Sequence, residues 1–161
     1  MGRRVVQPIQ GGELMIGMAA LLLTVTLAGA GSIETETEKT YTDEDLYVLS
    51  HIISAEAGNC QEEMMLYVGS VVLNRVADDR FPDTIYEVVF QDYPTLQYGP
   101  TKSGEYYNEP TKGAIEAAEK LLKEGSVLPA DVIYQSNKII GEYYTELDPP
   151  PGIGRTMYFC R

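Results

Sequence analysis

The chain has 161 residues, of which 44% are hydrophobic, enough for one domain with a substantial core plus a short leader. Its formal net charge of −12 argues against nucleic-acid binding, which requires basic surface. A single histidine and two distant cysteines are a poor ligand set for zinc and no EF-hand spacing is present, so we expect neither a metal nor another cofactor.

The N-terminal 30 residues have the pattern of an export signal. Arg3 and Arg4 precede an uncharged apolar run, Leu14 to Ala30, that ends in the small-residue sequence Ala-Gly-Ala. We expect a signal peptide over residues 1–30; because the run is close to the shortest membrane span, an uncleaved N-terminal anchor is the alternative. Residues 31–41 are polar and acidic and predict a linker, and the domain is expected to be secreted or otherwise extracytoplasmic.

The first predicted helix extends from the N-cap Thr42 to Ala57 and ends at Gly58. Three acidic residues occupy its first turn, where they suit the helix dipole. Apolar residues then recur at the spacing of one buried helix face, and Glu56 takes the next position on that face. The stripe consists of Leu46, Leu49, Ile52 and Ile53.

Glu56 is the candidate catalytic residue. A carboxyl group in a half-buried place should have a raised pKa, because burial disfavours the charged form. A general acid needs this property. The alternative interpretation is that Glu56 is a last-turn residue whose side chain reaches solvent.

A second helix is predicted to follow at once, with Asn59 as N-cap and Glu62 at the reciprocal capping position. Its segment from Met64 to Val76 is apolar on nearly every side, which predicts a place at the centre of the domain.

The two cysteines, Cys60 and Cys160, are expected to form a disulfide, because an isolated pair in an exported protein is usually oxidised. The bridge would close a loop of about 100 residues and stabilise the fold by roughly 4 to 5 kcal/mol. Two free buried thiols are the alternative.

The remaining sequence predicts short elements around a long loop. Thr84 caps a short helix, residues 91–109 are irregular, and a third main helix begins at Pro110 and ends at Gly125. Two short strands are predicted, at Val132–Gln135 and Met157–Cys160. The fold class is therefore α+β, a helix-dominated single domain with a small antiparallel sheet.

No second acid stands out as a catalytic partner of Glu56. Glu105 and Glu109 lie in the long loop, where acids are usually solvated. His51 points about 140° away from Glu56 around the helix and is expected to be an ordinary surface or core-edge residue. This asymmetry suggests a one-acid mechanism rather than the paired carboxylates of most glycosidases. A cysteine amidase or peptidase using Cys60 with His51 is a weaker alternative.

Three blocks resemble the SleB-type cell wall hydrolase family, whose founding members are spore-cortex-lytic enzymes: HIISAEAG at 51–58, VGSVVLNRV at 68–76 and RFPDTI at 80–85. Residues 93–98 (YPTLQY) are similar to the family's P-G-Q-[FY] segment with one residue inserted. Residues 154–160 resemble its terminal G-x-H-x-F segment, but Thr156 and Met157 stand where the histidine is expected. The resemblance covers residues 42–161, the predicted catalytic domain.

The resemblance implies a lysozyme-like fold and cleavage of the bond between N-acetylmuramic acid and N-acetylglucosamine in peptidoglycan. Such enzymes are regarded as lytic transglycosylases with one glutamic acid, which falls on Glu56. The matched segments also imply a sugar groove formed by Gln97, Tyr98, Tyr134 and Gln135. We expect a monomer whose partner is the glycan strand, without nucleic acid and with no membrane contact beyond a possible anchor. A non-catalytic peptidoglycan-binding or scaffold domain that kept the fold is the alternative.

Overall fold

The computed structural model describes residues 41–161. The expected leader, residues 1–30, and all but the last residue of the expected linker lie outside the described residues. Within the described part of the chain, none of the helices combines the length and apolar character that a membrane crossing requires.

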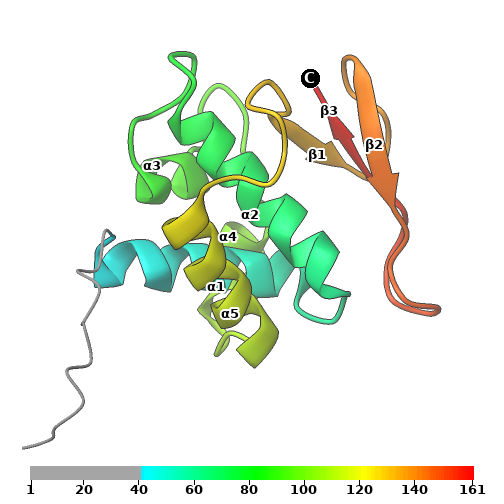
Figure 1. Ribbon diagram of the computed structural model, residues 1–161, viewed down its shortest axis with the longest axis horizontal. Helices are drawn as coiled ribbons and strands as arrows, with labels where there is room; N and C mark the ends of the chain where they lie inside the picture. Colours follow the sequence, from blue (N-terminus) through cyan, green and yellow to red (C-terminus); the bar gives the residue numbers. More distant parts are fainter. Residues whose placement is uncertain (1–40) are drawn as a thin grey trace, which may run out of the picture. The chain divides into compact units, whose positions relative to one another are not determined.

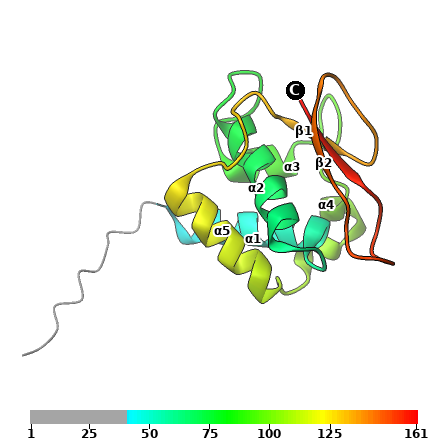
Figure 2. The same ribbon diagram turned by 45° about the vertical axis from the view of Figure 1, so that its right-hand side comes forward.

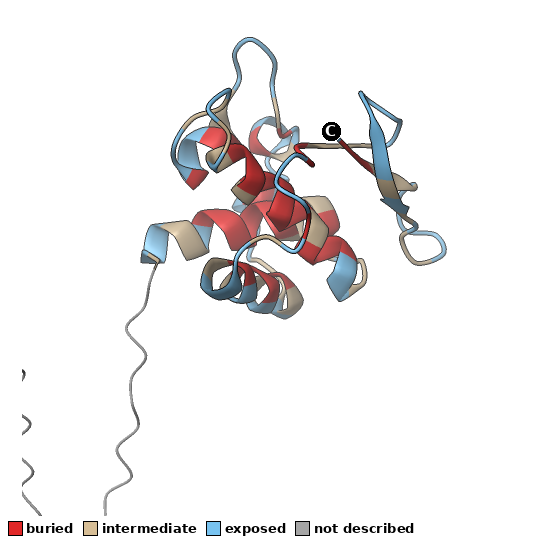
Figure 3. Ribbon diagram, turned by 45° about the horizontal axis from the view of Figure 1, so that its top comes forward, coloured by how far each residue is buried: buried red, intermediate tan, exposed pale blue. Residues whose placement is uncertain are grey.

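Three helices form the body of the domain: α1 (Asp43–Ala57), α2 (Glu62–Val76) and α5 (Lys112–Glu124). They pack against one another, and the short helix α3 (Ile85–Phe90) packs on α1 and α2 (Figures 1 and 2). The buried residues concentrate along α1 and α2, as the red segments of Figure 3 show. The prediction that α2 lies at the centre of the domain is confirmed, because most of its residues are buried.

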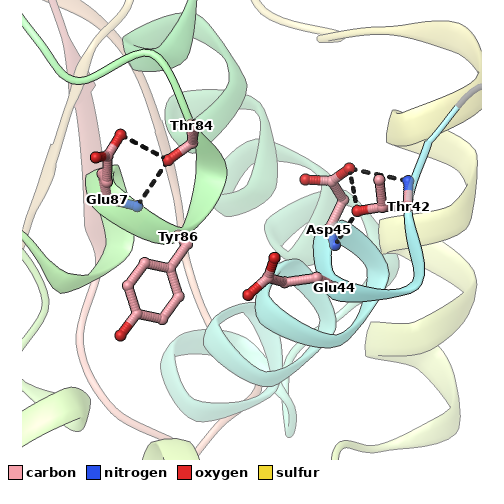
Figure 4. Close-up of a pocket in the computed structure, with 6 residues that line it drawn as sticks. All are labelled: Thr42, Glu44, Asp45, Thr84, Tyr86 and Glu87. Carbon is pink, nitrogen blue, oxygen red and sulfur yellow. Dashed lines mark hydrogen bonds between the residues drawn. The ribbon is translucent and has the colours of Figure 1, made fainter.

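The start of α1 is fixed by a reciprocal cap. The Thr42 hydroxyl accepts a hydrogen bond from the Asp45 backbone N–H at 3.0 Å, and the Asp45 carboxylate accepts one from the Thr42 N–H at 2.9 Å. The start of α3 has a similar cap: the Thr84 hydroxyl accepts a hydrogen bond from the Glu87 backbone N–H and donates one to the Glu87 carboxylate (Figure 4). Both predicted N-caps are therefore confirmed.

Two predicted helix starts were wrong. Asn59 is exposed and does not cap α2; Gln61 is the N-cap residue, since the backbone N–H of Cys60 still bonds to the Ala57 carbonyl and completes a turn first. The third main helix begins after Thr111, whose hydroxyl accepts the Ala114 N–H, rather than at Pro110. In both places a neighbouring residue has the extended backbone that an N-cap requires.

The long segment between α3 and α5 is less irregular than predicted. It contains one turn of helix, α4 (Pro100–Ser103), and the 3₁₀ turn η1 (Glu105–Tyr107). Gly104, with φ +103°, separates the two. That backbone conformation favours glycine, so the presence of Gly104 allows the helix to break between α4 and η1.

A three-stranded antiparallel sheet stands beside the helices, with the strand order β1-β3-β2 (Figure 1). The strands are β1 (Tyr134–Ser136), β2 (Tyr143–Leu147) and β3 (Met157–Cys160). Two of them were predicted, and β2 was missed. Because β2 is largely exposed, it has no alternation of apolar and polar residues to reveal it. The predicted class, helix-dominated α+β with a small antiparallel sheet, is confirmed.

The predicted disulfide is absent: Cys60 and Cys160 are both free thiols. Cys60 lines a pocket together with Met157, at the first residue of β3, whereas Cys160 is the last residue of that strand. Cys160 does not line that pocket, and three residues of extended chain, about 10 Å, separate it from Met157. Compartment and cysteine count suggested the pairing, but the direction of β3 separates the two thiols.

Candidate active site

Glu56 lies in the last turn of α1, half-buried, at the wall of a pocket of about 390 Å³. The rest of the lining comes from the α1–α2 turn, the end of β1 and the connection from β2 to β3. These residues are Cys60, Met64, Asn137, Pro149, Ile153, Gly154, Arg155, Thr156 and Met157. The Glu56 side chain therefore lines a pocket and does not lie on an open helix surface.

Burial raises the pKa of Glu56 from 4.5 to about 7. The positive charge of Arg75 acts in the opposite direction and the negative charge of Glu105 adds to the increase, but the loss of hydration dominates. A carboxyl group with such a pKa is largely protonated under mildly acidic conditions. It can therefore donate a proton to a bound oxygen atom.

Two hydrogen bonds to Asp148 fix the connection between β2 and β3: one attaches it to the start of α2, and the other lies within the connection. The Gln61 side-chain amide donates to the Asp148 carbonyl at 2.9 Å, and the Thr156 hydroxyl donates to the Asp148 carboxylate at 2.6 Å. Thr156 stands where the resembling family has histidine, and here its side chain closes the loop on itself. Thr156, which departs from the family pattern, thus helps to fix one wall of the pocket.

Arg75 lies behind the candidate acid as a buried cation, 4% exposed. Its Nε donates to the Ile133 carbonyl at 2.8 Å, and its guanidinium carbon lies 5.3 Å from the ring centroids of both Phe81 and Tyr98. Its Nη1 is buried without a hydrogen-bond partner. An arginine in this position anchors β1 to α2 and supplies positive charge to the interior near Glu56.

Tyr98 is the largest fully buried side chain, only 1% exposed. Its hydroxyl makes no hydrogen bond of standard geometry, but the Arg75 guanidinium is close enough to interact with it. Burial raises the pKa of Tyr98, the charge of Arg75 lowers it, and the charge of Glu56 adds a smaller increase. The ring is thus part of the core beside Arg75 and within electrostatic range of Glu56. It is not available for stacking on a ligand from the surface.

The other predicted groove residues lie apart from the pocket lining. Gln97 is half-buried and its side-chain amide donates to the Thr95 carbonyl at 3.1 Å. Gln135 pairs with Phe159 across the sheet and has a buried, unpartnered Oε1; Tyr134, its neighbour, points to the other face of β1. None of the four predicted groove residues is among those that line the pocket of Glu56.

His51 packs in the core, 6% exposed, with its Nδ1 2.7 Å from the Tyr47 carbonyl oxygen. Its ring contacts the rings of Tyr47 and Tyr106 at centroid distances of 3.9 and 5.6 Å. It lines a different pocket from Cys60, whose pKa is raised by burial. A nucleophilic cysteine needs a lowered pKa and a base beside it, so the geometry opposes a Cys60–His51 pair.

The loop acids are solvated, as expected. Glu105 is exposed and accepts a hydrogen bond from the Ser103 hydroxyl, which lowers its pKa. Glu109 is exposed at another pocket, near His51. Within residues 41–161, no group of three histidine, cysteine or acidic side chains is close enough to hold a metal ion.

Sequence reasoning missed Asn137 and Arg155, which line the pocket from the end of β1 and from the β2–β3 connection. Neither residue follows a periodic pattern, because both lie in connecting segments. The position of Arg155 beside Thr156, in the segment that resembles the family's terminal block, was the available signal.

Fold and site together define a helix-dominated α+β domain with one protonatable acid in an open pocket. The profile of the cell wall hydrolase family matches residues 60–149, and the chain belongs to this family. The matched range begins just after Glu56. No curated protein matches the chain.

Two solved structures share the fold. One is the catalytic domain of the germination-specific lytic transglycosylase SleB from Bacillus anthracis, with a TM-score of 0.61 and 18% identity, covering 75% of this chain and 97% of that one. The other is the catalytic domain of the Bacillus cereus SleB protein, with a TM-score of 0.58 and 22% identity, covering 81% and 100%. The lysozyme-like fold class predicted from the sequence is thereby confirmed.

Proposed function

We propose that this protein cleaves the bond between N-acetylmuramic acid and N-acetylglucosamine in peptidoglycan, outside the cytoplasm, as a lytic transglycosylase with Glu56 as its single acid and base. One observation carries the proposal: Glu56 is half-buried in a lined pocket, and its pKa is about 7. Membership of the cell wall hydrolase family supports the substrate class. The structural neighbour from Bacillus anthracis is a lytic transglycosylase, which supports the reaction type.

In the first step the protonated Glu56 carboxyl donates its proton to the glycosidic oxygen. The bond between C1 of the muramic acid residue and that oxygen breaks, and the N-acetylglucosamine side leaves as an alcohol. The positive charge that develops on the muramic acid ring is then close to a newly formed Glu56 carboxylate, which stabilises it.

In the second step the same carboxylate acts as the base. It accepts the proton of the 6-hydroxyl of the muramic acid residue while that oxygen forms a bond to C1, which closes a 1,6-anhydro ring. Glu56 is again protonated, so the cycle is complete without a water molecule or a second acid. A cycle that needs only one acid agrees with the lining of the pocket, since neither Glu105 nor Glu109 is part of it.

Arg75 contributes to both steps through its charge. Its guanidinium favours the carboxylate form of Glu56, so it counters the burial that would otherwise keep the acid protonated. The pKa of about 7 therefore results from burial, which raises it, and from the charge of Arg75, which lowers it. The acid gives up its proton without becoming a stable buried anion, and it recovers that proton from the 6-hydroxyl.

The direct test replaces Glu56 by glutamine, which keeps the shape of the side chain and removes the proton donor. Glu56→Gln should clear a suspension of purified cell walls at least about a thousandfold more slowly than the parent. Glu109→Gln, which removes an exposed acid outside this pocket, should clear it at the parental rate. Retained clearing by Glu56→Gln would end the catalytic assignment.

Two further measurements separate the alternatives. Binding of the parent to insoluble peptidoglycan without any clearing would favour a scaffold domain. Mass spectrometry of the released fragments distinguishes the reaction types: 1,6-anhydro ends support transglycosylation, whereas reducing ends mean that water is the acceptor and that the one-residue cycle is wrong.

A further inference from the structure

The basic side chains of this acidic domain are nearly all occupied by partners. Arg75 is buried against a backbone carbonyl. The exposed ones form ion pairs with acidic residues: Arg80, Lys102, Lys112, Lys120, Lys123 and Arg161. Among residues 41–161 this leaves Lys138 and Arg155 without an acidic partner, although the chain as a whole has a formal net charge of −12.

Both unpaired cations lie in or next to the lining of the pocket of Glu56. Arg155 lines the pocket of Glu56, and Lys138 directly follows Asn137, which lines it too. In the sheet, Ser136 of β1 is opposite Tyr158 of β3. Lys138 follows the end of β1 by two residues and Arg155 precedes the start of β3 by two residues, so both lie at the same end of this antiparallel pair.

Apart from Glu56, the pocket has no acidic lining residue. The other lining side chains are apolar or neutral, so nothing in the wall neutralises the Arg155 guanidinium. In a domain rich in carboxylates, a cation at a pocket mouth that has no intramolecular partner remains free to bind an external anion. Guanidinium groups prefer planar carboxylates, which they hold with two parallel hydrogen bonds.

We propose that Arg155, assisted by Lys138, forms a subsite for a carboxylate carried on the lactyl arm of the muramic acid residue. This inference rests on the proposed function, because it assigns to that pocket the part of the substrate that distinguishes muramic acid from N-acetylglucosamine. Both sugars have the same ring and the same acetamido group, but the lactyl arm belongs to muramic acid alone. An arginine at the pocket mouth would therefore fix which of the two sugars lies beside Glu56.

Two sources could supply the carboxylate. In a strand with peptide stems, the lactyl group is an amide and the stem carries free carboxylates. In a strand without stems, the lactyl carboxylate itself is free. Three soluble glycan preparations of equal length separate them: strands with intact stems, strands stripped of their stems, and stem-bearing strands whose carboxylates have been converted to neutral amides.

The experiment measures binding of the full chain to these three preparations, with Glu56→Gln as the background so that no strand is cleaved. Adding Arg155→Gln should weaken binding of the preferred anionic strand about tenfold, the loss expected for one charge-assisted contact. Binding of the neutral strand should not change. Adding Lys138→Gln should give a smaller loss of the same kind, since Lys138 assists.

Lys112→Gln is the matched control, because it removes one exposed positive charge from α5, outside the pocket lining. It should leave binding of all three strands at the value of the Glu56→Gln background. Raising the salt concentration should reduce the preference for the anionic strand in that background and should have little effect in the Arg155→Gln variant.

The proposal is overturned if Arg155→Gln binds the anionic strand as tightly as the background does, or loses the anionic and neutral strands equally. It is also overturned if no strand binds. Failure of the proposed function gives a different result: the parent would release no fragments from any strand, whereas the carboxylate preference and its dependence on Arg155 would remain measurable. Stem-bearing and stripped strands then show which carboxylate is bound.

Discussion

At the scale of single residues, the protonation state of Glu56 decides what the pocket can do. Burial raises the pKa of Glu56 more than Arg75 lowers it, and Glu105 adds a smaller increase. The charged groups involved come from different elements, since Glu56 is in the last turn of α1, Arg75 is on α2 and Glu105 begins η1. The pKa of the acid is therefore a property of the folded domain and is not contained in the α1 sequence.

The first prediction concerns the pH dependence of cleavage. The value of kcat/KM should be level on the acidic side and fall about tenfold per pH unit above about pH 7, because the proton donor is lost there. Glu105→Gln should move this alkaline limb to lower pH, since it removes an anion that holds the pKa up. Rates of cell wall clearing between pH 4 and 9 give the profile.

Glu109→Gln serves as the control for this profile, because Glu109 is an exposed acid of the same loop and does not act on the pKa of Glu56. The alkaline limb of the pH profile of Glu109→Gln should coincide with that of the parent. A parental limb near pH 4.5 would contradict the assignment, since it would report a solvated carboxylate with its ordinary pKa.

A second prediction tests whether Tyr98 is a core residue or a substrate contact. The Tyr98 hydroxyl is buried without a hydrogen bond of standard geometry, and its interaction with the Arg75 guanidinium is a weak one, so Tyr98→Phe should change the free energy of unfolding by no more than about 1 kcal/mol. Tyr98→Ala should lower it by about 3 to 5 kcal/mol. Urea denaturation measures both. A marked loss of stability in Tyr98→Phe would mean that the hydroxyl has a hydrogen-bond partner, such as a buried water.

The candidate acid could be predicted from the sequence because its signal is local. Glu56 interrupts an apolar stripe on one helix, and helix periodicity specifies which side of α1 it occupies. Arg155 and Asn137 could not be predicted in the same way, because they reach the pocket through the placement of the sheet beside the helices. Tyr98 was expected in the groove because residues 93–98 resemble a family segment, but its depth depends on packing against Arg75.

At the scale of elements, the close approach of α1, α2 and α5 depends on Gly69. A Cβ atom at this position would meet Leu121 Cδ1 of α5 and Ile53 Cδ1 of α1. Both belong to fully buried side chains, so there is no free space into which they can move. The absence of a side chain at Gly69 therefore permits the helix crossing that holds the end of α1, and with it Glu56, in place.

The third prediction follows from this contact. Gly69→Ala should lower the free energy of unfolding by about 1 to 3 kcal/mol, because the added methyl group forces buried side chains out of position. Gly99→Ala is the matched control: nothing lies within 4 Å of the corresponding Cβ, and its φ of −54° suits any residue. The midpoints of thermal unfolding compare the two, and equal midpoints would contradict the packing argument.

Helices with strong local signals were predictable, whereas elements that depend on distant partners were not. The N-cap Thr42 was predicted correctly, because the hydrogen bond that its hydroxyl accepts lies within one turn; the return bond to the Asp45 carboxylate was not predicted. The N-cap of α2 was misplaced at Asn59, because Gln61 is fixed in part by its bond to Asp148, far along the chain. The exposed strand β2 is defined by pairing with β3 and has no apolar pattern of its own.

At the scale of the whole molecule, β1 is attached to the helical body by the polar residues near the end of α2. Asn74 donates from its side-chain amide to the carbonyls of Pro129 and Val132 at 2.7 and 2.9 Å, and Arg75 donates to Ile133. These bonds explain why the otherwise apolar helix α2 becomes polar near its end. The sheet, and therefore the far wall of the pocket, takes its position from α2.

The predicted disulfide was wrong because composition does not show whether two cysteines lie close together in the fold. Whether two cysteines meet depends on the path of the chain between them, and β3 separates Cys160 from the pocket that Cys60 lines. A covalent link was expected to close the domain, but the sheet is attached through hydrogen bonds and side-chain packing instead. Stability therefore depends on the core and on the charges buried in it, including Glu56.

The fourth prediction is that the proposed acid destabilises the folded domain above neutral pH. The pKa of Glu56 is about 7 in the fold and returns to its ordinary value of 4.5 on unfolding, so the folded state binds more protons between these values. Stability should fall as the pH rises through this range, by about 3 kcal/mol in total at about 1.4 kcal/mol per pKa unit. Below pH 4 the carboxyl is protonated in both states and contributes no such loss.

Glu56→Gln removes this titration and should flatten the dependence. The free energies of unfolding of parent and variant should differ by a constant amount below pH 4, and the variant should gain about 3 kcal/mol relative to that baseline by pH 8. Urea denaturation at pH 4, 6 and 8 measures the difference, with Glu109→Gln as a control that removes an exposed acid. A difference that stays constant with pH would show that the Glu56 carboxylate is fully hydrated in the fold. It would then have no raised pKa with which to protonate a glycosidic oxygen at neutral pH.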